Sequence, residues 1–81
     1  MRLLENISHP HCRISVFSWN EKYIIELEWG QLKQSFKVNH DSVTGIEQIR
    51  KMVTDDFLNE AYLQFQQMQT NLSKSFQQSN Q

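Results

Sequence analysis

Residues 12–38, CRISVFSWNEKYIIELEWGQLKQSFKV, decide the fold because they contain three runs rich in β-branched and aromatic residues. Short pairs join the runs, first Asn20-Glu21 and then Gly30-Gln31. Asn and Gly tolerate the positive φ angle that two-residue hairpin turns need. The stretch therefore predicts a meander of three antiparallel strands, at residues 12–19, 22–29 and 32–38.

Two-residue turns also fix the register, because side chains alternate between the two faces of a sheet. The predicted neighbours are Phe17 with Ile24, Val16 with Ile25, Ile14 with Leu27, Glu28 with Lys33, Ile25 with Phe36, and Tyr23 with Val38. One face is then almost entirely apolar, and the other places Glu28 between Arg13 and Lys33. A slip of one residue would mix the faces and lose these charge pairs, each worth roughly 0.2–1 kcal/mol.

A helix is expected after the meander. Thr44 and Glu47 match a capping box, with Thr44 as the N-cap. Residues 52–56 are a candidate kink, where Thr54 would cap a second helix. The apolar residues then recur at steps of three or four, as on one face of a helix: Ile46, Ile49, Val53, Phe57, Ala61, Phe65, Met68 and Leu72.

These elements predict an α+β fold, in which a three-stranded antiparallel meander is packed on one face by a long C-terminal helix, straight or kinked. Each element has one apolar face to bury. The 81 residues suffice for one small domain. Residues 1–8 fit either an edge strand or a first helical turn. The expected parts are an N-terminal segment at 1–11, the meander at 12–38, the helix at 44–72 and a frayed polar tail at 73–81.

The helix is too long for the sheet. A strand of seven or eight residues spans roughly 25 Å, whereas a helix over residues 45–72 spans about 42 Å. The apolar side chains of Phe65, Met68 and Leu72 are therefore expected to overhang and to need a partner. A second copy is the commonest solution. The alternative is a helix that bends back at residues 54–56 and covers its own sheet.

Three apolar side chains lie on the otherwise charged face of the meander, near the first turn: Phe17, Trp19 and Ile24. A group of aromatic side chains rimmed by charge is typical of an interaction site. Alternatively, the N-terminal segment folds over them. A nucleic-acid-binding protein would use Phe17 and Trp19 to stack bases.

The charge balance disfavours nucleic-acid binding, because 8 Lys and Arg face 9 Asp and Glu and the net charge is −1. A single cysteine permits no internal disulfide. We expect no signal peptide and no membrane-spanning segment, since no apolar run approaches the ~20 residues that a spanning helix needs. These features together indicate a cytoplasmic protein.

Candidate chemical groups are sparse. His9, His11 and Cys12 cluster, and His40 could approach them, but their spacing is not that of a zinc site. The run from His40 to Ser42 holds triad residue types, yet triads are assembled from separated segments. We expect no enzyme, no cofactor, no metal and no small-molecule substrate. The sequence predicts a protein-interaction domain, a homodimer or a subunit of a larger assembly, with a nucleic-acid-binding module as the alternative.

Overall fold

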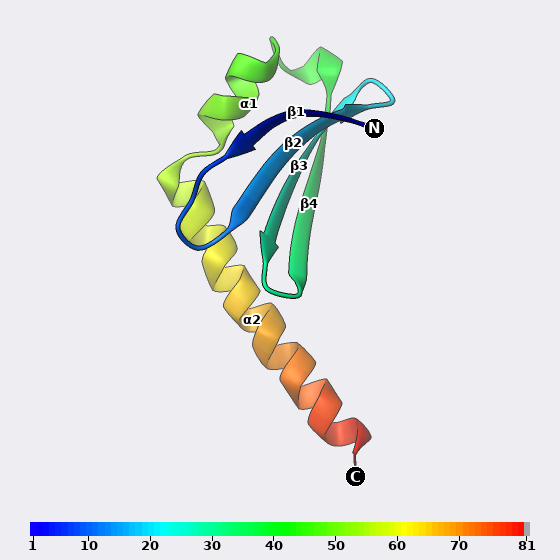
Figure 1. The fold of residues 1–81 in the computed structure, drawn as a ribbon, viewed down its shortest axis with the longest axis vertical. Coiled ribbons are helices and arrows are strands. Elements are labelled where there is room, and N and C mark those ends of the chain that lie inside the picture. Colours follow the sequence, from blue (N-terminus) through cyan, green and yellow to red (C-terminus); the bar gives the residue numbers. More distant parts are fainter. Residues whose placement is uncertain (81) are drawn as a thin grey trace.

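The chain folds into four antiparallel strands and two α-helices (Figure 1). The structure is a computed structural model that describes residues 1–80. The strands pair in the order β1-β2-β3-β4. The α+β class is confirmed, and the predicted strand count of three is wrong. The elements are β1 (Arg2–Ile7), β2 (Arg13–Trp19), β3 (Lys22–Trp29), β4 (Leu32–Asn39), a 3₁₀ helix η1 (His40–Ser42), α1 (Ile46–Met52) and α2 (Asp55–Ser79).

The additional strand β1 lies at the edge of the sheet beside β2, which decides between the two alternatives for the N-terminal segment. Leu3 faces Phe17, but Glu5 faces Val16, because a bulge at Leu4 adds one residue. The bulge turns the side chains before and after it to different faces. Apolar and polar residues in β1 therefore do not alternate regularly, and the sequence pattern of a strand is hidden.

The register of β2, β3 and β4 is confirmed in all six predicted pairs. The first turn has positive φ at both central residues, 53° at Asn20 and 62° at Glu21, as a type I′ hairpin requires. Gly30 supplies the positive φ of 59° in the second turn. The turns thus set which residues face each other along the whole meander.

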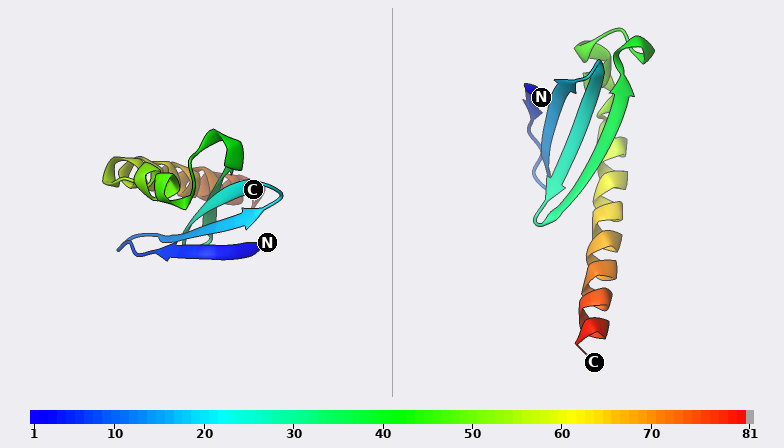
Figure 2. Two further views of the ribbon diagram at one scale, coloured as in Figure 1. Left: turned by 90° about the horizontal axis from the view of Figure 1, so that it is seen from above. Right: turned by 90° about the vertical axis from the view of Figure 1, so that its right-hand side faces the viewer.

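Both helices lie on one face of the sheet, called here the covered face, and the other face is open (Figure 2). The covered face and the helices share one core. Phe65 of α2 is its largest fully buried side chain. The buried core residues are Cys12, Ile14, Val16, Ile25, Leu27, Ile49, Leu58, Ala61 and Phe65.

The predicted single helix is two helices, because the chain breaks at Val53 and Thr54. Thr54 adopts an extended conformation, and its Oγ1 accepts a hydrogen bond from the N–H of Phe57 at 3.2 Å. This bond satisfies one of the free N–H groups that every helix start exposes. The expected cap of a second helix is therefore present, and α2 continues to Ser79 through most of the expected frayed tail.

The predicted capping box at Thr44 is wrong by one residue. Gly45 occupies the N-cap position of α1 and, having no side chain, cannot cap a helix N–H group. The side chain of Gln48 instead accepts from the N–H of Thr44 at 2.9 Å. Glu47 points to Arg50, which also binds Glu5 of β1 with Nε and Oε2 2.6 Å apart. This contact ties α1 to the edge strand.

The two threonines give a matched test of helix capping. Thr54→Ala removes the hydrogen bond to the N–H of Phe57 and should lower the free energy of unfolding by about 1 kcal/mol. Thr44→Ala should lower it by less, because the hydroxyl of Thr44 caps no helix N–H: it donates to Oε1 of Gln48 at 3.3 Å, and the N–H of Thr44 keeps its bond to the same oxygen. Urea midpoints measure both changes. A larger loss for Thr44→Ala would contradict the assigned helix starts.

Candidate interaction surfaces

The second helix runs past the end of the sheet (Figures 1 and 2). Its 25 residues span about 37 Å, against about 26 Å for the eight residues of β4. Residues 69–79, called here the overhang, are all exposed. The expected overhang therefore exists, and the break at residues 53–54 does not bend it back onto the sheet.

The boundary of the overhang lies further along the helix than the sequence predicts. Phe65 was expected to overhang, but it is 0 % exposed and its ring packs against Trp29 with the centroids 6.0 Å apart. Met68 is half-buried against the same core. Leu72, however, is 47 % exposed, and Phe76, which lies beyond the predicted stripe, is 68 % exposed. Of the predicted stripe, Leu72 is thus the exposed member, and Phe76 extends the exposed part by one turn.

Leu72 and Phe76 continue the buried stripe of α2. At 100° per residue, each lies within about 20° of Phe65 around the helix axis, whereas Leu63 lies about 160° away. Leu72 and Phe76 of the overhang therefore lie on the same face of α2 that packs against the sheet earlier in the helix. The steps from Phe65 to Met68, Leu72 and Phe76 are three or four residues, so Phe76 was identifiable from the spacing alone.

The overhang has little intrinsic support as a helix. Lys74 is the one charged residue from position 61 to 80, so no pair of opposite charges can stabilise it along its length. Thr70, Asn71, Ser73 and Ser75 are weak helix formers. A short helix of this composition is marginal in water on its own. A partner surface along the apolar stripe would provide the missing stabilisation.

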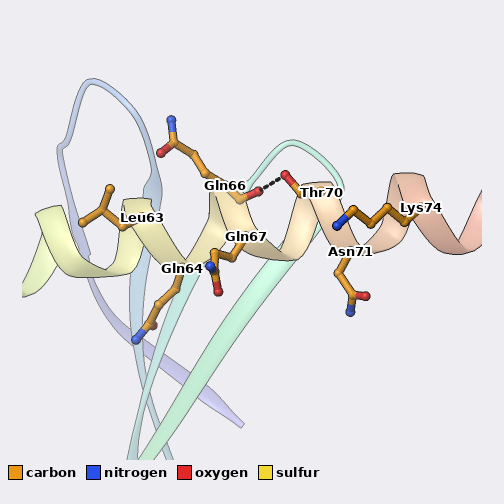
Figure 3. A pocket seen from close by; sticks show the side chains of 7 residues that line it. All are labelled: Leu63, Gln64, Gln66, Gln67, Thr70, Asn71 and Lys74. Atoms are coloured by element: carbon orange, nitrogen blue, oxygen red, sulfur yellow. Dashed lines mark hydrogen bonds between the residues drawn. The ribbon is translucent and has the colours of Figure 1, made fainter.

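A notch lies where the overhang leaves the sheet. Its lining combines the turn between β3 and β4, at Gln31, with the exposed apolar side chains Leu72 and Phe76. On the opposite side of α2, Figure 3 shows a shallow depression whose side chains fan out along one helix and do not converge on a point. The lining residues of that depression are Leu63, Gln64, Gln66, Gln67, Thr70, Asn71 and Lys74.

Phe17, Trp19 and Ile24 lie together on the open face, but the group is only partly exposed. Ile24 is 5 % exposed, flanked across the strands by Phe17 and Lys37, while Trp19 is 50 % exposed. Leu3 stands beside Phe17 in the sheet and is itself half-exposed. The alternative that the N-terminal segment folds over this group is therefore wrong, since β1 extends it sideways.

His40 is not brought to the cluster of His9, His11 and Cys12. His40 hydrogen-bonds Ser18 with Nε2 and Oγ 3.3 Å apart, and its N–H bonds Glu21 in the turn between β2 and β3, whereas His9 and His11 lie in the connection between β1 and β2. The length of β2 separates that turn from that connection. His9 Nδ1 accepts from the N–H of His11. Within residues 1–80, no three His, Cys, Asp or Glu side chains form a group that could hold a metal ion.

Cys12 is buried in the core, and this burial raises the pKa of its thiol above the ordinary value. The reactive thiolate is therefore disfavoured in the folded chain. We expect slow labelling by a thiol reagent at neutral pH and fast labelling in denaturant. Because the pKa is raised, the stabilising contribution is complete below the pKa of the unfolded thiol and declines as pH rises above about 8.5. A native labelling rate equal to the unfolded rate would contradict this.

The burial of Phe65 predicts a clear difference between two positions of α2. Phe65→Ala should lower the free energy of unfolding by roughly 3–5 kcal/mol, because it leaves a cavity between the helix and the sheet. Leu63→Ala on the opposite, exposed side should change it by less than about 0.5 kcal/mol. Chemical denaturation measures both. Similar losses would mean that α2 is rotated about its axis.

Comparisons with protein-family models, with curated proteins and with solved structures found no match to this chain. Within the described residues, no helix combines the length and the apolar character needed to cross a membrane. The interaction surfaces therefore rest on geometry alone.

Proposed function

We propose that this chain is a small non-enzymatic interaction module that assembles as a homodimer through the α2 overhang. The observation that carries the proposal is the exposure of Leu72 and Phe76 on the stripe that is otherwise buried in the core. Exposing two such side chains forgoes roughly 1.5–3 kcal/mol each. A small domain has little stability to lose in this way.

A second copy suits the overhang for two reasons. The overhang is almost uncharged, so two of them can lie side by side without like-charge repulsion beyond that of Lys74. A two-fold axis would also pair each apolar stripe with an identical one, as closed dimers require. In an antiparallel arrangement, Phe76 of one copy lies near the notch at Gln31 of the other, where Leu72 is already exposed. Each notch then receives one aromatic ring.

The dimer predicts a specific response to charge on the stripe. Leu72→Glu combined with Phe76→Glu should convert the dimer to a monomer, because each interface would bury four unpaired carboxylates. Light scattering at micromolar concentration measures the mass. Phe65 is unsuitable for this test, since it is buried within the chain and a charge there would disrupt the core of each protomer.

Leu63→Glu is the matched control, because it adds one carboxylate to the same helix on the opposite, exposed side. It should leave the dimer intact. A wild-type chain that runs as a monomer, together with a double variant as stable as the wild type, would show that the overhang is not a subunit interface.

The alternative function is nucleic-acid binding through the open face. Trp19 is half-exposed there and lies opposite Lys22, an arrangement that could stack a base beside a phosphate contact. Glu26 and Glu28 share the face and oppose phosphate. Retention on a nucleic-acid column that falls with salt and is lost in Trp19→Ala would favour this function over the dimer.

A further inference from the structure

The strand β4 is the second free edge of the sheet, and it is regular where β1 is bulged. Its register with β3 is continuous over all eight residues. In a two-residue hairpin, the residues flanking the turn exchange both backbone hydrogen bonds, and every second residue after them does so too. The bond from the N–H of His40 to the carbonyl of Glu21, at 2.9 Å, follows this alternation.

The alternation leaves a row of outward-pointing backbone groups on β4. Leu32, Gln34 and Phe36 direct their N–H and C=O groups to β3. Lys33, Ser35 and Lys37 therefore direct theirs to the open side, and all three residues are exposed. A row of this kind is a ready template for another strand.

Side chains beside this edge form two hollows between β4 and the helices, one on each side of Phe36. Phe36 is 37 % exposed, and its ring meets that of Phe57 edge to face with the centroids 5.5 Å apart. The apolar hollow is completed by Val38, Met52 and Val53. An added strand would direct every second side chain into these hollows.

The second hollow has a mixed lining of amide and apolar side chains, and Gln34 beside it has an acceptor without a partner. Gln34 donates from Nε2 to the carbonyl of Ala61 at 3.0 Å, and its buried Oε1 has no hydrogen-bond partner within the described residues. The rest of the lining comes from two strand residues and four helix residues: Ser35, Phe36, Gln64, Gln67, Met68 and Asn71. A side chain with an N–H or O–H donor fits at this position.

The charges of Lys33 and Lys37 decide which residues of an added strand fit opposite β4 on the open face. Lys37 makes no ion pair with any part of residues 1–80, and Lys33 makes a single one, to Glu26 at 3.5 Å. A strand with acidic residues facing these two positions would be favoured. A second β4 fits poorly, because pairing about Ser35 sets Lys33 of one copy opposite Lys37 of the other.

We propose that the free edge of β4 binds an extended segment of another protein as a fifth strand, and that this segment directs apolar and amide side chains into the hollows and acidic side chains toward Lys33 and Lys37. Apart from Asn71 in the second hollow, the site uses no residue of the α2 overhang, and it does not rest on the dimer. In the antiparallel direction, the fitting order opposite residues 38 to 33 is apolar, acidic, apolar, Thr or Ser, amide, acidic.

The probe is a fluorescent peptide of the order Val-Glu-Val-Thr-Gln-Glu, titrated with the full chain and read by anisotropy. Binding is expected, and a peptide with Lys in place of both Glu should bind more weakly. Lys37→Glu should weaken the acidic peptide about tenfold and strengthen the basic one, since it exchanges attraction for repulsion. Equal binding of both peptides, or of neither, overturns the proposal.

Backbone pairing has its own matched control. Methylating the peptide nitrogen of Thr, which faces Ser35, removes an N–H that bonds β4 and should abolish binding. Methylating that of the second Val, which faces Phe36, removes an N–H that points away from β4 and should leave binding unchanged. An equal effect of the two methyl groups would show that the peptide is not an added strand.

Two further measurements separate the possible occupants. The Leu72→Glu and Phe76→Glu double variant should bind the peptide as the wild type does, so failure of the dimer and failure of this site are distinguishable. The mass of the free chain should not change in Ser35→Pro, which removes an outward N–H that a second β4 would need and leaves the charges as they are. A loss of mass in this variant would place a second copy on the edge of β4 and overturn the proposed partner.

Discussion

The packing of Phe65 against the covered face fixes the position of α2 on the sheet. Its ring is fully buried and contacts Trp29 near the turn between β3 and β4. Because Phe65 lies 10 residues after the start of α2, at Asp55, the helix still has 14 residues to run beyond it. Those residues have almost no sheet left to cover. The overhang is thus a direct consequence of where this one aromatic ring is buried.

The two edges of the sheet are treated differently. β1 is short and bulged, and Glu5 on it is held by Arg50 of α1, so it is a poor template for another strand. β4 is longer and regular. Along its outward-pointing backbone groups, two lysines disfavour pairing with another copy of the same strand. Lysine protects an edge against self-pairing but attracts a strand of opposite charge. The same residues can therefore exclude a second copy and select a partner.

The open face is less simple than its charge pattern suggests. Its cross-strand row from Leu3 through Phe17 and Ile24 to Lys37 is apolar over three strands. Ile24 is nevertheless buried, because its neighbours in the row stand on both sides of it. The exposed apolar side chains on this face are therefore Leu3, at one end of the row, and Trp19, two residues after Phe17 on β2.

By itself, the sequence determined the features that depend on local chemistry. The turns at Asn20 and Gly30 set the register of three strands, and period-two alternation then assigned every residue to a face. The N-cap at Thr54, followed by acidic residues, was a local signal of the same kind, although it indicated a candidate kink in one helix and not two separate helices. Such features involve residues close in the chain, so their pattern is visible without a fold.

Tertiary structure alone decided the features that depend on contacts between distant segments. The pairing of β1 with β2 was hidden by the bulge at Leu4, which breaks the alternation. The burial of Phe65 depends on how far along the sheet α2 is placed, a quantity set by packing against Trp29 and not by helical spacing. Periodicity defines which face of a helix is apolar, but only the opposing surface defines how much of that face is covered.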